Sequence, residues 1–226
     1  MKLTVDGAKL LPVAHHILSE LGRVRSMFAQ PLRGKVKVGI PDHYDDMIFE
    51  TALVEFSRAY PEVDMTVTSG CTSGFAKEIE AGRLDIAVVN SIGSHSGEIL
   101  ETEATHWVEG DGFEYRPEDP LPLAVLDRDC WWSEMPGKVL TEHDRAFNIK
   151  FRSESFSNLR CAIRAGLAIG VLPARAVQQG MRIADKSRNL PALPAVTHSF
   201  LFSATAPQDV VQEMASKLRD GIRKPS

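Results

Sequence analysis

The sequence is poor in cysteine, in aromatic residues and in long apolar runs. Its three cysteines, Cys71, Cys130 and Cys161, lie far apart and form no Cys-x-x-Cys motif, so we expect reduced thiols in the cytoplasm and no disulfide scaffold. No apolar stretch approaches the ~20 residues needed to cross a bilayer, and the amino terminus lacks the pattern of a secretory signal. We therefore expect neither membrane insertion nor export.

Positive charge is not in excess either. The 226 residues include 26 Lys and Arg against 30 Asp and Glu, which gives a net charge of -4. Proteins that bind DNA usually carry Lys and Arg clustered on one face and are basic overall, so we do not expect this chain itself to bind nucleic acid. With 43% hydrophobic residues, it is nevertheless long and apolar enough to bury a core.

Common catalytic motifs are also absent. The sequence contains no GxSxG, HExxH, Walker or GxGxxG pattern, and its seven histidines are scattered. We expect no enzyme, no catalytic residue and no cofactor. Asp and His residues near position 43 would suit a divalent cation, but too few ligands cluster there for us to predict a metal site.

The first clear pattern in the sequence is a long series of regularly spaced apolar residues near its amino terminus. Apolar residues recur at alternating spacings of three and four over positions 3–28, which predicts a helix with one apolar face that a partner can cover. We expect residues 1–30 to form a linker and dimerisation helix, capped by Thr4 and disturbed by Pro12. The predicted dimerisation residues are Leu3, Leu10, Ile17, Leu21, Val24 and Phe28.

After a break at Pro31 and Gly34, strand and helix patterns alternate. We expect strands at 35–40, 63–68, 84–89, 121–126, 148–151, 167–172 and 198–203, and helices at 46–59, 73–81, 131–142, 155–165 and 207–222. This rhythm predicts an α/β fold of two Rossmann-like lobes with parallel sheets and a central cleft. Lobe I comprises 35–90 and 198–226, lobe II comprises 121–195, and 91–120 forms the crossover region.

Several of these segments resemble the LysR-type transcriptional regulators. Residues 3–21 (LTVDGAKLLPVAHHILSEL) resemble the linker helix of that family. GKVKVGIPD at 34–42 and AGRLDIAVVN at 81–90 resemble the first half of its effector-binding region, and SFSNLRCAIRAGLAIGVLP at 155–173 resembles the second. The pieces PDHYDD, HWVEG and PLPLAVLDRDC are most similar to the subgroup that contains repressors of motility and exoenzyme genes.

The resemblance implies a periplasmic-binding-protein-like fold of type II that binds a small-molecule effector between its lobes and pairs with itself as a dimer or tetramer. Family members begin with a winged helix-turn-helix that reads DNA, and this sequence starts at the linker helix. We therefore expect a fragment of a complete regulator, or else a natural truncation that titrates full-length partners; DNA would be contacted only through the absent domain.

Ligands in open α/β folds bind beyond the carboxyl ends of the strands, which gives the candidate effector-binding residues. The resemblance places Asp42, His43, Tyr44, Thr72 and Ser73 at the effector pocket, and the ends of later strands add Asn90, Ser91, Asp127, Ser153 and Ser155. Helix capping and turn formation are the alternative roles for these polar residues. The alternative function is a bilobal solute-binding protein that serves a transporter, which would require export.

Overall fold

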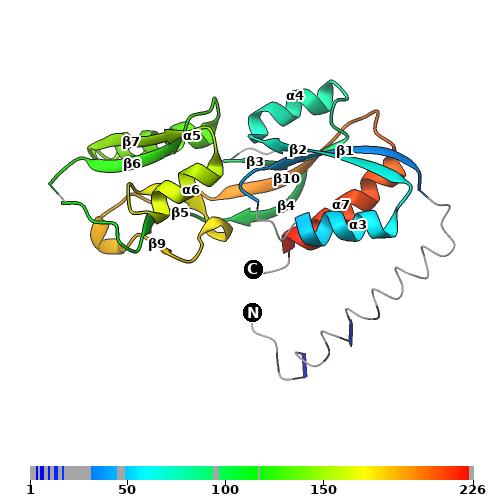
Figure 1. The fold of residues 1–226 in the computed structure, drawn as a ribbon, viewed down its shortest axis with the longest axis horizontal. Coiled ribbons are helices and arrows are strands. Elements are labelled where there is room, and N and C mark those ends of the chain that lie inside the picture. Colours follow the sequence, from blue (N-terminus) through cyan, green and yellow to red (C-terminus); the bar gives the residue numbers. More distant parts are fainter. Residues whose placement is uncertain are drawn as a thin grey trace.

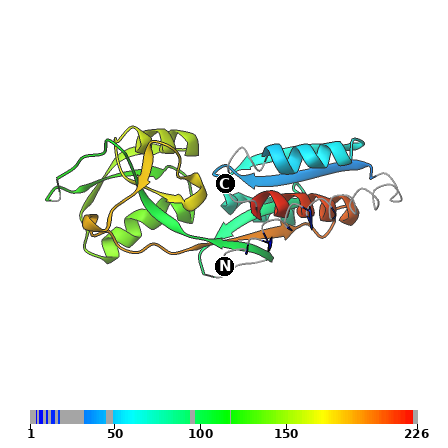
Figure 2. The ribbon, with the colours of Figure 1, turned by 90° about the horizontal axis from the view of Figure 1, so that it is seen from below.

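The computed structural model describes residues 32–44, 49–93, 97–116 and 118–223, and also residues 4, 6, 7, 10, 13, 14 and 17. They form two α/β lobes side by side (Figures 1 and 2), as the sequence predicts. No helix among them is long and apolar enough to cross a membrane.

Five strands form the sheet of lobe I, in the order β2-β1-β3-β10-β4. Strand β1 pairs in parallel with β2 and β3, whereas β10 runs antiparallel to both β3 and β4. The expectation of a purely parallel sheet is therefore wrong, because β10 brings the chain back from lobe II and runs in the opposite direction. The strands are β1 (Gly34–Pro41), β2 (Val63–Gly70), β3 (Ile86–Ser91), β4 (Glu98–Glu103) and β10 (Val196–Phe202).

Helices cover both faces of this sheet (Figure 1). On one face lie α3 (Val54–Ala59), which follows a π-helical turn at Phe49–Leu53, and α7 (Gln208–Arg223). On the other lies α4 (Phe75–Glu80), after a short 3-10 turn at Thr72–Gly74. The predicted apolar face of α7 is buried against the sheet: Val210, Val211, Met214, Leu218 and Ile222.

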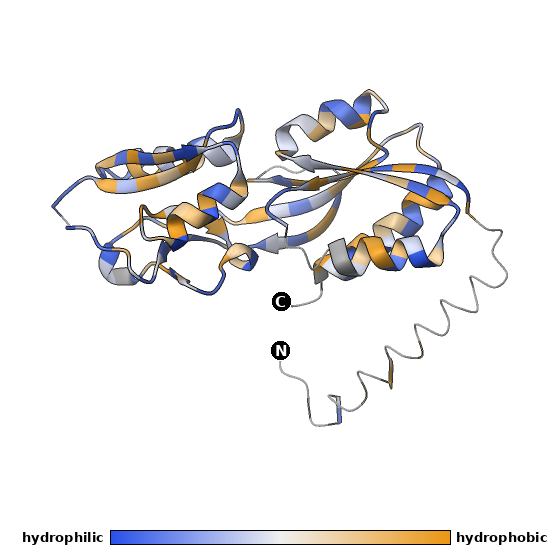
Figure 3. Cartoon of the chain, viewed as in Figure 1, coloured by the Kyte–Doolittle hydropathy of each residue, from blue (hydrophilic) through white to orange (hydrophobic). Residues whose placement is uncertain are grey.

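Lobe II combines two small sheets around a second core, and apolar and polar residues lie side by side along its helices and strands (Figure 3). Strands β6 (Leu121–Leu126) and β7 (Phe147–Ser153) are parallel, and β5 (Thr105–Gly110) pairs antiparallel with β8 (Gly170–Pro173) and β9 (Met181–Ile183). Helices α5 (Trp131–Glu142) and α6 (Phe156–Arg164) pack on these strands. The sequence predicts β6 and α5 to the residue but misses β9, which is only three residues long.

The chain crosses between the lobes inside the predicted crossover region and again before β10. Within 91–120, β4 belongs to the sheet of lobe I and β5 to a sheet of lobe II. The short turns η3 (Ala174–Ala176) and η4 (Lys186–Arg188) precede the second crossing. The two crossing segments lie close together, which gives the molecule a narrow waist (Figure 2).

The predicted linker helix is described only in part. Residues 6, 7, 10, 13, 14 and 17 are helical, and Thr4 Oγ1 accepts a 3.1 Å hydrogen bond from the backbone of Gly7, which confirms Thr4 as a capping residue. Leu10 is 63% exposed and Ile17 54% exposed. The other predicted dimerisation residues, Leu3, Leu21, Val24 and Phe28, lie outside the described residues.

Candidate functional site

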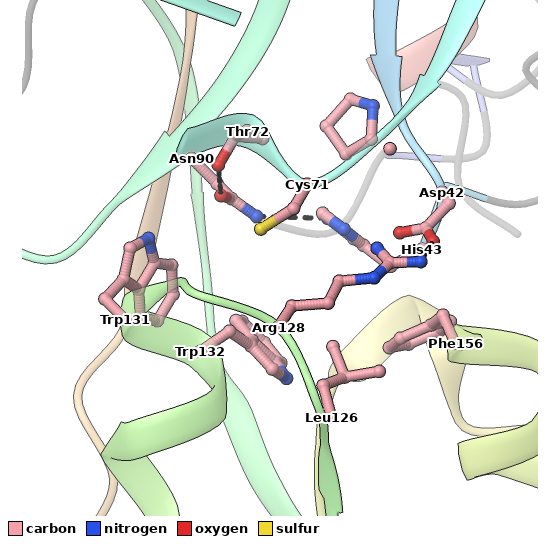
Figure 4. Close-up of a pocket in the computed structure, with 12 residues that line it drawn as sticks. Asp42, His43, Cys71, Thr72, Asn90, Leu126, Arg128, Trp131, Trp132 and Phe156 are labelled. Atoms are coloured by element: carbon pink, nitrogen blue, oxygen red, sulfur yellow. Dashed lines mark hydrogen bonds and ion pairs between the residues drawn. The ribbon is translucent and has the colours of Figure 1, made fainter. Parts of the chain in front are cut away.

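A cavity lies between the lobes, beyond the carboxyl ends of β1, β2, β3 and β6 (Figure 4). Its volume is about 20 Å³, which leaves room for little more than one water molecule. The space between these side chains is therefore too small for a larger molecule in this arrangement of the lobes. The lining residues are Pro41, Asp42, His43, Gly70, Cys71, Thr72 and Asn90 from lobe I, and Leu126, Arg128, Trp131, Trp132 and Phe156 from lobe II.

An ion pair joins the two lobes at this cavity. Arg128 Nη2 donates a 2.7 Å hydrogen bond to Asp42 Oδ2, and both side chains are about three-quarters buried. Burial alone would lower the pKa of Arg128, but the hydrogen bond and the charge of Asp42, together with the two nearby cysteines, outweigh burial and raise the pKa, so the guanidinium stays charged. Arg128 Nη1 is buried and has no hydrogen-bond partner among the described residues. The cavity therefore offers an unused cationic donor.

On the lobe I side, three polar side chains form a chain of contacts. Thr72 Oγ1 donates to Asn90 Oδ1 at 2.6 Å, and Asn90 Nδ2 lies 3.4 Å from His43 Nε2. Because the amide nitrogen is a donor, His43 Nε2 is the acceptor of this contact. The three residues come from the ends of three different strands, so the sheet itself holds their spacing.

The His43 ring is neutral and packs among aromatic side chains of lobe II. Burial, followed by the nearby His198 and Arg175, lowers the pKa of His43 from 6.5 to about 3 despite the attraction of Glu103. The ring stacks on Trp132, with centroids 6.0 Å apart and planes inclined by 11°, and it meets the edge of Phe156 at 5.9 Å. One wall of the cavity is therefore apolar and aromatic.

Behind the cavity, a buried polar network joins the segments that cross between the lobes. The Tyr44 hydroxyl lies 2.5 Å from His198 Nδ1, and His198 Nε2 lies 3.1 Å from Glu103 Oε2. Burial raises the pKa of Tyr44 far above 10, so its hydroxyl donates to Nδ1 and the proton of His198 sits on Nε2. Arg175 donates to Glu103 through its backbone N and its Nε, both at 2.8 Å, and also bonds Glu101.

The same network contains a group that could hold a metal ion among the described residues: Glu101, Glu103 and His198. The guanidinium of Arg175 already pairs with both carboxylates. A cation bound there would lie against this positive charge, so the arrangement favours a structural role over a metal centre.

Four predicted site residues line the cavity: Asp42, His43, Thr72 and Asn90. Tyr44 lies behind it, in the buried network. Ser73 lies beside it, where its hydroxyl donates across the lobes to the carbonyl of Asp129 at 3.2 Å. Ser91 ends β3, and its buried hydroxyl has no partner among the described residues.

The predicted residues of lobe II do not line the cavity. Asp127 faces another hollow on lobe II and lies 3.7 Å from Arg152. Ser153 accepts a bond from the backbone of Ser155, and Ser155 caps α6 by accepting from Asn158 N at 3.3 Å. The predicted capping role of Ser155 is confirmed.

Sequence reasoning missed most of the lobe II lining. Arg128 follows Asp127 directly after β6, and of the two only Arg128 lines the cavity. Trp131 and Trp132 open α5, and Phe156 opens α6. Two aromatic residues directly after the turn that follows a strand are the sequence signal that could have predicted this aromatic wall of the cavity.

The comparisons with known proteins agree with this architecture. The family model for the LysR substrate binding domain matches residues 29–220. The chain is 26% identical to the HTH-type transcriptional regulator DgdR of Burkholderia cepacia over 219 residues, which cover 96% of this chain and 74% of that protein. It is 22% identical to the HTH-type transcriptional regulator PecT of Dickeya dadantii, over 98% of this chain and 71% of PecT.

Solved structures share the fold. The regulatory domain of HypT from Salmonella typhimurium superposes with a TM-score of 0.65 at 17% identity, over 85% of this chain and 97% of that domain. The reduced form of the OxyR regulatory domain from Pseudomonas aeruginosa gives a TM-score of 0.62 at 15% identity, over 86% and 99% of the two chains.

Proposed function

The chain belongs to the LysR substrate-binding domain family, and we propose that its effector binds in the cavity between Asp42 and Arg128. It is the effector-sensing region of a LysR-type transcription regulator, and its relatives are regulators rather than enzymes. A solute-binding protein of the same architecture is not favoured by these relatives.

The observation that carries the proposal is the convergence of strand ends from both lobes on one cavity. An effector that contacts both lobes has a different affinity for the open and closed arrangements, and it therefore shifts the balance between them. Thr72, Asn90 and neutral His43 supply polar contacts from lobe I, and Arg128 supplies charge from lobe II. The remaining predicted residues do not line the cavity: Tyr44, Ser73, Ser91, Asp127, Ser153 and Ser155.

We extend the proposal to the assembly. The regulator works in the cytoplasm as a homo-oligomer, with the helix that the sequence predicts for residues 1–30 as its dimerisation element. Lobe closure changes how the copies pair, and DNA is contacted through a separate domain. Coupling of this kind requires the effector to bind one assembly state more tightly than the other.

A ligand screen tests the site. A set of metabolites is added to the protein and the Tm is measured, since a ligand at 100 times its Kd stabilises the folded state by about 2.7 kcal/mol. Any compound that raises the Tm is tested again on Asn90→Ala and on Lys138→Ala, an exposed position on α5. We expect the shift to disappear in Asn90→Ala and to persist in Lys138→Ala. A shift that survives in Asn90→Ala but is lost in Arg152→Ala would move the effector to the hollow beside Asp127 and overturn the proposal.

A further inference from the structure

A groove lies along α5, between this helix and residues 192–194 of the segment that returns to lobe I. Its volume is about 570 Å³, which falls within the roughly 300–1,000 Å³ that is usual for small-molecule sites. Apart from Ile92, which follows β3, its lining residues belong to lobe II. The groove therefore depends little on how closely the two lobes approach each other.

One wall of the groove is a row of apolar side chains on α5. Trp131, Met135 and Val139 are four residues apart, so they lie on the same helix face. Met135 is buried, and the other two are half-buried because they pack against the core of lobe II on one side and line the groove on the other. The helix thus offers an indole ring and two further apolar side chains to a ligand.

The facing wall is held in place by two hydrogen bonds from β5. Trp107 Nε1 donates to the carbonyl of Pro191 at 2.8 Å, and Thr105 Oγ1 donates to the carbonyl of Pro194 at 2.7 Å. The two proline rings restrict φ and make this short segment stiff. Leu193, which lies between them, packs against the core of lobe II. The segment is therefore fixed on lobe II and keeps its distance from α5.

The charges along the groove leave one carboxylate without an ion-pair partner. Glu134, Lys138 and Glu142 are exposed and four residues apart, in a row beside the apolar one. Lys138 Nζ lies 4.0 Å from Glu142 Oε1, so these two charges offset each other. Glu134 forms no ion pair with any residue that the structure describes. Its negative charge lies one helical turn from the indole of Trp131, whose face attracts cations.

We propose that this groove is a second small-molecule site, separate from the effector cavity, which binds an organic cation with a flat apolar body, of the arylalkylamine class. The aryl group lies against Trp131, Val139 and Leu193, and the ammonium group lies at Glu134. The inference goes beyond effector sensing, because it adds a second ligand to the domain. Trp131 also lines the cavity between the lobes, so a molecule in the groove rests against a wall of that cavity.

Titration calorimetry with two probes of similar shape tests the class of ligand. At pH 7, 4-phenylbenzylamine is a cation and biphenyl-4-carboxylate is an anion, and both carry the same biphenyl body. We expect the amine to bind at least about fivefold more tightly, because only the amine pairs with Glu134. Equal binding of the two probes, tighter binding of the carboxylate, or no binding of the amine would overturn the proposal.

Matched variants locate the amine. Ala192 is an exposed residue in the groove wall, and Ala192→Trp should fill the groove and block binding. Glu134→Gln should remove most of the preference for the amine. Glu154→Gln, which removes an exposed carboxylate elsewhere on lobe II, is the control and should bind the amine as the wild type does. Circular dichroism confirms that each variant is folded.

Three results would place the amine elsewhere or give the groove another role. Wild-type affinity in Ala192→Trp would show that the groove is not the site, and loss of binding in Asn90→Ala would move the amine to the cavity between the lobes. If neither probe binds and Ala192→Trp sediments with a lower mass than the wild type, the groove is a contact between copies of the chain. Each result overturns the second site and leaves the effector cavity to its own ligand screen.

Discussion

Arg128 of lobe II and Asp42 of lobe I form a 2.7 Å ion pair at the cavity between the lobes. The pair is buried enough to be only partly screened by water, and the second amino group of Arg128 has no partner among the described residues. Because Asp42 and Arg128 come from opposite lobes, this ion pair forms only while the lobes are together.

Removing the charge of Asp42 should loosen this closure. Asp42→Asn keeps the shape but leaves Arg128 as a half-satisfied, largely buried cation, so we expect a loss of about 1–2 kcal/mol in the free energy of unfolding. Hydrogen exchange at residues 126–132 should become faster. Glu78→Gln, which removes an exposed ion pair with Arg83, is the control and should leave exchange at 126–132 as it is. Equal exchange in wild type and Asp42→Asn would show that the pair does not hold the lobes.

Glu103 should be a far more costly position. It accepts hydrogen bonds from Arg175 and His198 and is 8% exposed, so Glu103→Gln should lower the free energy of unfolding by about 3 kcal/mol. Denaturant unfolding of the two proteins at pH 7 measures this difference. A loss no larger than that of a surface substitution would show that this buried network contributes little to stability.

The same residue predicts a dependence on pH. Burial raises the pKa of Glu103, but the bonds from His198 and Arg175 outweigh it and hold the pKa below the ordinary value of 4.5. A carboxylate with a lowered pKa stabilises the fold above its ordinary pKa and loses this contribution as the pH falls further. The difference between wild type and Glu103→Gln should therefore be constant near neutrality and shrink below pH 4.5.

His43 should make the protein sensitive to mild acid. Its pKa is 6.5 when unfolded and about 3 in the fold, so the unfolded chain binds the extra proton between these values. Stability should fall as the pH drops below 6.5, by at most about 1.4 kcal/mol per pH unit from this group. His43→Gln keeps a hydrogen-bond acceptor toward Asn90 and removes the titration, so its stability should decline less steeply. If both proteins show the same slope, the acid sensitivity comes from other groups.

The sequence predicts best those elements whose burial pattern is regular. Leu121–Leu126 is a continuous apolar run, as expected for a strand covered on both faces, and it matches β6 to the residue. The direction of β10 could not be read from such a pattern, because a buried strand has the same composition in parallel and antiparallel pairing.

The cavity was predictable on one side only. Strand ends in the repeating β-α units of lobe I place Asp42, His43, Thr72 and Asn90 along one edge of the sheet, and all four line the cavity. Arg128 meets Asp42 across 86 positions of sequence, and nothing local indicates that Arg128 rather than Asp127 turns inward. That choice depends on how α5 packs on β6, which is a tertiary property.

The exposed apolar positions near the amino terminus predict self-association. Leu10 and Ile17 are seven residues apart, so they share a helix face, and more than half of each side chain is exposed. Each such side chain contributes roughly 1.5–3 kcal/mol when a second copy buries it. We expect the wild-type chain to sediment as a dimer or larger at micromolar concentration, and Leu10→Asp combined with Ile17→Asp to sediment as a monomer. Ile183→Asp, at a 52% exposed position on β9, is the control and should keep the wild-type assembly. A monomeric wild-type chain would refute the dimerisation helix and leave the cavity between the lobes as the basis of the function.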